Sequence, residues 1–406
     1  MPTRSLSDWL SYIESQHPSE IELGLERGLT VLDKLNLGRP KQKVITVAGT
    51  NGKGSTCAML TQYLVASGYK VGTYTSPHFL RFNERVALNG AECSDELLCQ
   101  AFEKIEQARG DTPLTYFEFS TLAALWVFDQ LKLDYWVLEV GLGGRLDSVN
   151  MIDTDLAVVT SIALDHVDWL GDSIEQIGRE KSGIARNGKP LVSGVVNPPA
   201  SIAETAREIG ATLSQKHLDF SYSVDGDCWR WWSGNSVFEE LPLPKLPLEN
   251  AATVIAVLSK LGVAVDQAKL KTLFETATLL GRFQKVAESP DVYIDVAHNP
   301  EAAVQLKSQV EKLNQPVIAV CGMLKDKDIA SVMNVLAGAF DSWKLISLGG
   351  PRGATAQELR AYLESAEVYG SLSDAVESAK DEAKVKSAVI VVFGSFLTVS
   401  EYLATQ

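Results

Sequence analysis

Short apolar runs alternate with amphipathic stretches along most of the chain. Apolar runs rich in β-branched residues are typical of strands buried in a parallel sheet, and the amphipathic stretches have the spacing of helices that cover it. In the first part of the chain, strands are predicted at residues 43–49, 70–75, 135–140, 156–161 and 190–195. Helices are predicted between them at 53–67, 94–109, 118–132 and 173–186. The pattern therefore predicts an α/β fold with a mostly parallel sheet.

The pattern changes at residues 220–240, which alternate and turn like an antiparallel hairpin. A proline-rich stretch and a predicted helix at 249–262 follow. A second alternating series then predicts strands at 291–296, 316–321, 343–348 and 388–393, with helices at 300–313, 327–340, 355–365, 372–384 and 395–404. Because 406 residues exceed what one hydrophobic core usually serves, we expect two domains, 1–284 and 285–406.

Composition narrows the function classes. Hydrophobic residues make up 46% of the chain and charged residues 22%, which is ordinary for a globular enzyme. A net charge of −14 argues against nucleic acid or anionic membranes as partners. The five cysteines show no C-x-x-C spacing, and no signal peptide or membrane span is evident. We therefore expect a cytoplasmic enzyme that acts on small molecules as a monomer.

Residues 44–56 are the most informative stretch. An apolar strand, a glycine-rich turn and a helix N-terminus together form a phosphate cradle, to which Lys53 adds a mobile cation. The match departs from the standard P-loop, because Gly54 follows the lysine where Ser or Thr is expected. The alternative is an ordinary strand-to-helix turn with a solvated lysine. The prediction is a nucleoside triphosphate site formed by Thr50, Asn51, Gly52, Lys53, Gly54 and Ser55.

Polar residues follow the predicted strands at the edge where ligands gather in α/β sheets. Glu139 ends a buried strand, where a carboxylate is costly unless it is paired or binds a metal, so it is the first candidate for magnesium. Arg145, after a glycine turn, could grip a carboxylate or phosphate, or could form a structural pair with Glu139. Ser76 could bind metal or phosphate, although a structural Ser-Pro turn is the simpler interpretation.

The next strand end carries His166, which is either a hydrogen-bonded structural residue or a ligand. Lys181, on the following helix, could be paired in a salt bridge or desolvated and open to carbamylation, and the residues alone favour the salt bridge. In the second domain, Arg282 stands at the predicted hinge and could reach phosphates held by the first domain. Asp295 ends a strand where it could hold a ribose hydroxyl, and Asn299 could cap the helix that starts at residue 300.

Taken together, these motifs resemble the folylpolyglutamate synthase and dihydrofolate synthase family of the Mur-ligase superfamily. The resemblance covers nearly the whole chain, and the glycine after Lys53 is the family's own form of the loop. It is carried, in order, by residues 23–27, 49–55, 75–78, 115–118, 138–147, 165–166, 180–181, 250–253, 281–283, 295–300 and 394–396.

The resemblance implies an N-terminal P-loop-type ATPase domain with a mostly parallel sheet and a smaller C-terminal Rossmann-like domain. It also implies an amide ligase that uses ATP and two magnesium ions, phosphorylates a carboxylate of a pterin substrate and adds L-glutamate. In that enzyme Ser76, Glu139 and His166 would hold metal, Lys181 would be carbamylated, Asn250 would meet adenine, Arg282 the phosphates and Asp295 the ribose. His298 would lie near the same cleft. The pterin side would be formed by Leu23, Thr115, Tyr116, Phe117, Glu118, Arg145 and Leu146.

Three classes of function remain open on these grounds: a folate ligase, another Mur-type ligase and a binding module that does not catalyse. The chain most resembles family members that act on both dihydropteroate and reduced folates, in folate and one-carbon metabolism. It could instead act on reduced folates only, or be another Mur-type ligase acting on a cell-wall nucleotide peptide. A non-catalytic nucleotide-binding module is the third possibility, but the density of ionisable residues at strand ends argues against it.

Overall fold

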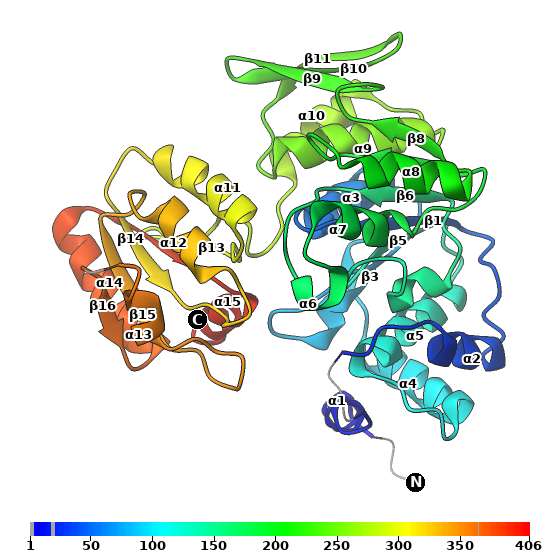
Figure 1. Ribbon diagram of the computed structural model, residues 1–406, viewed down its shortest axis with the longest axis horizontal. Helices are drawn as coiled ribbons and strands as arrows, with labels where there is room; N and C mark the ends of the chain where they lie inside the picture. Colours follow the sequence, from blue (N-terminus) through cyan, green and yellow to red (C-terminus); the bar gives the residue numbers. More distant parts are fainter. Residues whose placement is uncertain (1–3, 18–20, 364) are drawn as a thin grey trace. The chain divides into compact units, whose positions relative to one another are not determined.

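The computed structural model describes residues 4–17, 21–363 and 365–406, and its contacts divide the chain into two compact units. The first unit is Met1–Ala277 and the second is Thr278–Gln406. The boundary predicted from the sequence, between residues 284 and 285, falls inside β12 (Gln284–Ala287), all of which belongs to the second unit. Both units are α/β, as predicted, and each is built on its own sheet (Figure 1).

The main sheet of the first unit has eight strands in the order β4-β3-β2-β5-β1-β6-β7-β8. Strands β2, β5, β1, β6, β7 and β8 are parallel to one another. At one edge of the sheet, β3 pairs antiparallel with β2, and β4 pairs antiparallel with β3. The bounds are β1 Lys43–Ala48, β2 Val71–Tyr74, β3 Val86–Leu88, β4 Ala91–Glu92, β5 Tyr135–Glu139, β6 Leu156–Val159, β7 Pro190–Ser193 and β8 Thr212–Gln215. Parallel order brings the carboxyl ends of β1, β2, β5 and β6 to one edge, which is where the candidate site residues follow.

Helices pack on this sheet and on one another. Their bounds are α1 Leu6–Glu14, α2 Glu26–Lys34, α3 Lys53–Ala66, α4 Asp95–Arg109, α5 Tyr116–Asp129, α6 Val167–Leu170, α7 Ile174–Ser182, α8 Ala200–Ile209, α9 Leu248–Lys260 and α10 Gln267–Thr276, with short 3-10 turns at Phe82–Arg85 and Ser148–Met151. Helix α5 is apolar on nearly every side because α1, α2 and α4 cover the face turned away from the sheet.

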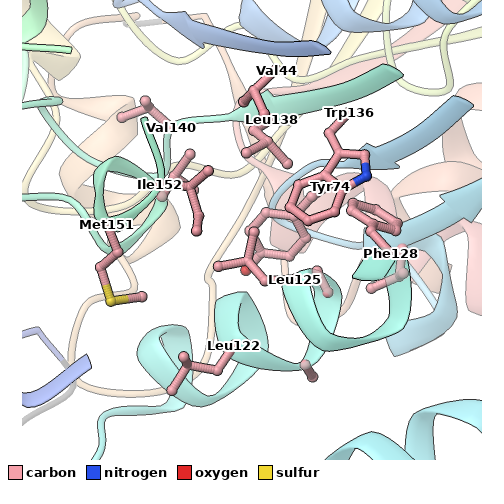
Figure 2. Close-up of a cluster of buried hydrophobic side chains, with 14 of the residues drawn as sticks. Val44, Tyr74, Leu122, Leu125, Phe128, Trp136, Leu138, Val140, Met151 and Ile152 are labelled. Atoms are coloured by element: carbon pink, nitrogen blue, oxygen red, sulfur yellow. The ribbon is translucent and has the colours of Figure 1, made fainter. Parts of the chain in front are cut away.

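The core under α5 explains why this helix lies where it does. Leu122, Leu125 and Phe128 of α5 meet Trp136 and Leu138 of β5 in one buried cluster (Figure 2). The rings of Phe128 and Trp136 lie 5.8 Å apart between centroids. Burying side chains of this size contributes about 1.5–3 kcal/mol each to folding. The packing fixes the start of α5 close to the end of β5, so two candidate site segments are held by one core.

The antiparallel segment predicted at 220–240 is present, with a third strand added. Strands β9 Ser221–Asp225, β10 Cys228–Ser233 and β11 Ser236–Pro242 form a separate antiparallel sheet. Trp229 and Trp231 of β10 are buried, and the Trp231 indole donates a hydrogen bond to the Ala252 carbonyl of α9 at 3.0 Å. The small sheet therefore packs on the helix that carries Asn250.

The second unit has a six-stranded sheet in the order β12-β13-β17-β14-β15-β16, in which only β12 is antiparallel to its neighbour. Its strands are β12 Gln284–Ala287, β13 Val292–Asp295, β14 Val317–Cys321, β15 Ser342–Ile346, β16 Glu367–Tyr369 and β17 Val389–Phe393. Its helices are α11 Pro300–Glu311, α12 Ile329–Leu336, α13 Ala356–Arg360, α14 Leu372–Lys386 and α15 Phe396–Ala404. No helix among the described residues has the length and apolar character needed to cross a membrane.

Candidate active site

The glycine-rich loop joins β1 to α3, and the helix begins without a side-chain cap. Gly52 is the N-cap residue and has a φ of 83°, in the left-handed region that favours glycine. A helix N-terminus leaves backbone N–H groups without partners inside the helix, and its dipole attracts negative charge. Ser55 lies in the first turn, and its buried hydroxyl has no hydrogen-bond partner among the described residues. This end of α3 is therefore suited to receive an anion.

The segment after β6 holds this loop in shape. The Thr50 N–H donates to the Ser161 carbonyl at 2.9 Å, and the Asn51 N–H donates to the Ser161 hydroxyl at 3.0 Å. The Thr160 hydroxyl donates to the Asn51 carbonyl at 2.6 Å. These contacts occupy two backbone donors that the sequence analysis assigned to phosphate, so the start of α3 is the better-placed part of the loop. Sequence reasoning missed the role of Thr160 and Ser161, which lie more than a hundred positions from the loop.

Two lysines converge on one carbonyl of the loop. The Lys53 ammonium donates to the carbonyls of Gly49 at 3.0 Å and Thr50 at 3.2 Å, and the Lys181 ammonium donates to the Gly49 carbonyl at 3.1 Å. Lys181 is buried, and burial together with the nearby charge of Lys53 lowers its pKa to about 7. The salt bridge favoured from the residues alone is wrong, because Lys181 forms no ion pair within the described residues.

Acidic residues lie near these lysines, and one of them is Asp147. Asp147 is buried, and its carboxylate accepts hydrogen bonds from the N–H groups of Leu142 at 2.8 Å and Val149 at 2.9 Å. Burial raises the pKa of Asp147 to about 6, although both hydrogen bonds and the charge of Lys53 oppose that rise. The charges of Asp165 and Asp147 favour the protonated form of Lys181, but less strongly than burial disfavours it. Asp147 was not among the predicted site residues, although it ends the motif at residues 138–147 that was visible in the sequence.

The proposed metal residues occupy neighbouring strand ends. Glu139 is the last residue of β5, is buried, and accepts a hydrogen bond from the Ser76 N–H at 3.2 Å. His166 has a φ of 53° and begins α6 after Asp165, whose carboxylate accepts the His166 N–H at 2.9 Å. No group of three His, Cys, Asp or Glu residues within the described ranges lies close enough to hold a metal ion. The single carboxylate of Glu139, with Ser76 and His166, nevertheless fits magnesium, because this ion is usually held by one or two carboxylates together with waters and substrate phosphates.

Arg145 forms an ion pair, but with a different partner from the one considered in the sequence analysis. The Arg145 guanidinium lies 2.8 Å from the Glu180 carboxylate, and the backbone N–H of Arg145 donates to the Glu180 carbonyl at 2.8 Å. Its side chain is about half exposed. Gly183 allows this approach, because a Cβ there would lie 2.6 Å from the Cβ of Arg145. The arginine therefore ties the glycine turn after β5 to α7, which carries Lys181.

The segments predicted for the pterin side adjoin one another. Thr115 and Glu118 form a capping box at the start of α5, and the Arg27 guanidinium donates to Glu118 at 3.1 Å. The Gly24 N–H donates to the Leu146 carbonyl at 3.2 Å, so the Leu23 segment lies beside the turn after β5. The Phe117 ring is pressed against Gly141, and its centroid lies 6.1 Å from that of Tyr74. Tyr116 follows Thr115 and lies 6.2 Å from Phe82, centroid to centroid.

Asn250 also reaches the phosphate loop. It lies in the first turn of α9, and its amide is so close to Gly52 that a Cβ there would lie 2.5 Å from Oδ1. Behind it, Glu249 forms an ion pair with the fully buried Lys216 ammonium at 2.5 Å and accepts a short hydrogen bond from Tyr222. The loop, α9 and the small antiparallel sheet are thereby connected through Asn250 and its neighbour.

The second unit gathers the remaining predicted residues at the end of β13. The Asp295 carboxylate accepts hydrogen bonds from the N–H groups of Phe283 at 2.8 Å and Ala297 at 2.7 Å. Burial raises its pKa, and the charge of Arg282 opposes this rise.

Near the same strand end, His298 Nδ1 lies 2.7 Å from the Val296 carbonyl, which accepts a hydrogen bond from the Nδ1–H tautomer. Asn299 caps α11 by accepting from the Ala302 N–H at 3.0 Å, as the sequence analysis predicted. Arg282 also stacks over Phe396, at 5.7 Å from the ring centroid.

Comparison with known domains defines the class of protein. Residues 47–239 match the Mur ligase middle domain, and residues 281–396 match the glutamate ligase domain of Mur ligases. A phosphate loop at an uncapped helix end and carboxylates at the neighbouring strand ends are what an ATP-dependent ligase of this type requires. The chain is therefore a Mur-type ATP-dependent amide ligase, and the fold class predicted from the sequence is confirmed.

Whole-chain comparisons define the family more closely. The dihydrofolate synthase/folylpolyglutamate synthase of Escherichia coli K12 is 48% identical over 98% of this chain and 94% of its own length. The structure of E. coli FolC in complex with DHPP and ADP superposes with a TM-score of 0.96, at 47% identity over 99% of this chain and 97% of that one. A bifunctional folylpolyglutamate synthase/dihydrofolate synthase with Mn, AMPPNP and L-glutamate bound gives a TM-score of 0.94, at 46% identity over 99% and 98%. The chain belongs to the dihydrofolate synthase/folylpolyglutamate synthase family, as its motifs predicted.

Proposed function

We propose that this protein joins L-glutamate to dihydropteroate and to reduced folates through an acyl phosphate, using ATP and a divalent metal ion. The observation that carries the proposal is the convergence of Lys53 and Lys181 on the Gly49 carbonyl beside the uncapped start of α3. The bound DHPP, ADP, AMPPNP, Mn and L-glutamate of the two structural relatives support the same substrates and cofactors here.

The first step activates a poor electrophile. An oxygen of the substrate carboxylate attacks the γ-phosphorus of ATP, the bond between that phosphorus and the bridging oxygen breaks, and ADP leaves. Lys53 turns from the loop carbonyls to the phosphates, where its charge stabilises the negative charge of the transition state. The N-terminal N–H groups of α3 and the Ser55 hydroxyl hold the remaining phosphate oxygens.

The second step forms the amide. The amino group of glutamate attacks the acyl carbon, the bond to the phosphate oxygen breaks, inorganic phosphate leaves and the amine loses a proton. Two magnesium ions, when bound, neutralise phosphate charge and orient the transferred group. Glu139, Ser76 and His166 are the residues proposed to hold them, with Lys181 as a further oxygen ligand once carbamylated.

The remaining predicted contacts are part of this proposal. Asn250 lies beside Gly52 and is proposed to meet the adenine. Arg282 is proposed to contact the phosphates and Asp295 to contact the ribose, so an alanine substitution of either should raise the KM for ATP. His298 is a further candidate catalytic residue, and the effect of its alanine substitution on kcat tests that role. The pterin contacts are assigned to the segments that include Leu23, Arg145, Leu146 and Thr115–Glu118. The segment after Leu23 contacts both of the others, because it is hydrogen-bonded to Leu146 and to Glu118.

ADP release by the purified protein tests the proposal. Reactions contain ATP, magnesium and L-glutamate, with dihydropteroate or tetrahydrofolate supplied separately, and product masses are read in parallel. We expect ADP release and glutamyl products with both acceptors, each dependent on L-glutamate. Turnover with tetrahydrofolate alone would restrict the protein to folylpolyglutamate synthesis, and turnover only with a cell-wall nucleotide peptide would identify another Mur-type ligase. Hydroxylamine in place of glutamate should capture the acyl phosphate as a hydroxamate.

Two further expectations accompany this function. We infer that the enzyme acts as a monomer in the cytoplasm on small molecules, without nucleic acid or membrane as partner. Light scattering during size-exclusion chromatography should give the mass of one 44.1 kDa chain. A dimer mass would reject the expected monomer without affecting the proposed reaction.

A further inference from the structure

Arg85 is a buried arginine that the function described above does not use. It ends the 3-10 turn Phe82–Arg85, directly before β3, and only 8% of it is exposed. Its carbonyl accepts the Thr75 N–H at 2.9 Å, so its backbone is fixed beside Ser76. The position places Arg85 between the end of β2, where substrate activation is proposed, and the first turn of α5 on the predicted pterin side.

The surroundings of the guanidinium are aromatic and neutral. Its Nε–H donates to His78 Nδ1 at 2.7 Å, which requires a neutral imidazole at that nitrogen. The rings of Tyr116 and Phe82 lie 5.4 and 5.8 Å from the guanidinium carbon. No carboxylate within the described parts of the chain lies within 4.0 Å of this cation.

Three other buried cations of the chain have the carboxylate partner that Arg85 lacks among the described residues. Arg109, equally buried, pairs with Glu106 at 2.6 Å. Lys344 pairs with Glu382 at 2.9 Å, and Lys216 pairs with Glu249. Removing a charge from water is costly unless an opposite charge or several hydrogen bonds replace the lost hydration. Neither terminal nitrogen of Arg85 is both fully buried and without a hydrogen-bond partner.

We propose that Arg85 binds a carboxylate of a glutamyl group that does not itself react. The inference rests on the proposed function, because it requires a substrate that carries such a group. A planar guanidinium matches a carboxylate through two parallel hydrogen bonds. The carboxylate that attacks ATP is a poor partner, since an ion pair with Arg85 would reduce its nucleophilicity. Two sources share the remaining chemistry: the α-carboxylate of the terminal glutamate of a folate substrate, and a carboxylate of the incoming L-glutamate.

Steady-state kinetics of Arg85→Met and Arg85→Lys tests the proposal. Methionine retains an apolar stem without charge, and lysine retains charge without the planar fork. We expect Arg85→Met to raise the KM for the glutamyl-bearing substrate about 10- to 100-fold, with a smaller rise for Arg85→Lys and little change in the KM for ATP. The matched control is Arg81→Met, four positions away, whose side chain is exposed and paired with Asp95 at 3.1 Å; its kinetics should equal those of the unmodified protein.

The pattern of KM values identifies the source. A higher KM for tetrahydrofolate with unchanged turnover of dihydropteroate, which has no glutamate, assigns Arg85 to the folate tail. A higher KM for L-glutamate with both acceptors assigns it to the incoming amino acid. Unchanged KM values in a folded Arg85→Lys protein would overturn the proposal, as would a fall in kcat alone that follows a lower melting temperature. If the unmodified protein shows no glutamate-dependent ADP release, the proposed function fails first, so the two failures are distinguishable.

Discussion

The low pKa of Lys181 leads to a prediction about covalent chemistry at the site. Only a neutral amine attacks carbon dioxide, forming an N–C bond and losing a proton to give a carbamate. With a pKa of about 7, about three quarters of Lys181 is neutral at pH 7.5. A lysine with its ordinary pKa of about 10.4 is neutral in only about one molecule in a thousand at that pH. Burial therefore raises the reactive fraction by several hundred-fold, and we expect Lys181 to carry a carbamate in bicarbonate buffer.

The carbamate is measurable directly by carbon-13 NMR. Protein equilibrated with 13C-bicarbonate should give one carbamate resonance that is absent from Lys181→Met. The neutral form dominates above the pKa, so the resonance should be weak at pH 6 and should grow as the pH rises through about 7. Turnover in carbonate-free buffer should fall and should recover when bicarbonate is added, because the carbamate supplies an anionic oxygen where the ammonium stood.

The control distinguishes Lys181 from lysines with ion pairs. Lys189 is paired with Asp155 at 2.8 Å and is partly exposed, so Lys189→Met should leave the resonance unchanged. Absence of any carbamate resonance between pH 7 and 8.5, in protein that is fully active without bicarbonate, would refute the reasoning. The lysine would then act as a hydrogen-bond donor to the Gly49 carbonyl only.

Three further substitutions test the loop and the start of α5. Lys53→Ala should lower kcat by about a hundred- to a thousand-fold with an unchanged melting temperature, because it removes charge stabilisation from the transition state; normal kinetics would remove Lys53 from the phosphate site. Gly52→Ala should raise the KM for ATP and cost about 1–2 kcal/mol of stability, since φ is positive there and a Cβ would lie 2.5 Å from Asn250 Oδ1; calorimetry and KM values measure both. Thr115→Ala should reduce the free energy of urea unfolding by about 1 kcal/mol by removing the cap shared with Glu118, and no change would show that the cap contributes nothing.

The strands were the part of the fold most readily predicted from the sequence. Residues 388–393 and 43–49 read as buried strands, and the structure has β17 at Val389–Phe393 and β1 at Lys43–Ala48, with nearly every residue buried. Continuous β-branched runs report burial on both faces, which is a local property of the chain. Helices α8 and α10 were missed because their burial depends on neighbours that the local pattern does not identify.

In the candidate site, too, some residues could be predicted from local sequence order, whereas the tertiary contacts between distant segments could not. The glycine loop and the strand-end carboxylates follow from order along the chain, so Lys53 and Glu139 could be proposed from spacing. The start of α5 was placed two residues late, although Thr115 and Glu118 form a capping box that a Thr-x-x-Glu spacing signals. The bracing of the loop by Ser161 and the pairing of Arg145 with Glu180 are tertiary contacts, and single-sequence spacing carries no signal for either.

The arrangement of charge explains why this site is ready for a triphosphate. Lys53 and Lys181 share the Gly49 carbonyl, and their mutual repulsion helps to lower the pKa of Lys181. An incoming polyphosphate would draw Lys53 away from that carbonyl and remove this repulsion. Conversion of Lys181 to a carbamate would replace a cation by an anion at the same place, which favours a bound metal ion over a second ammonium. The same two lysines can therefore brace the loop and, after one covalent change, complete opposite sides of the charged site.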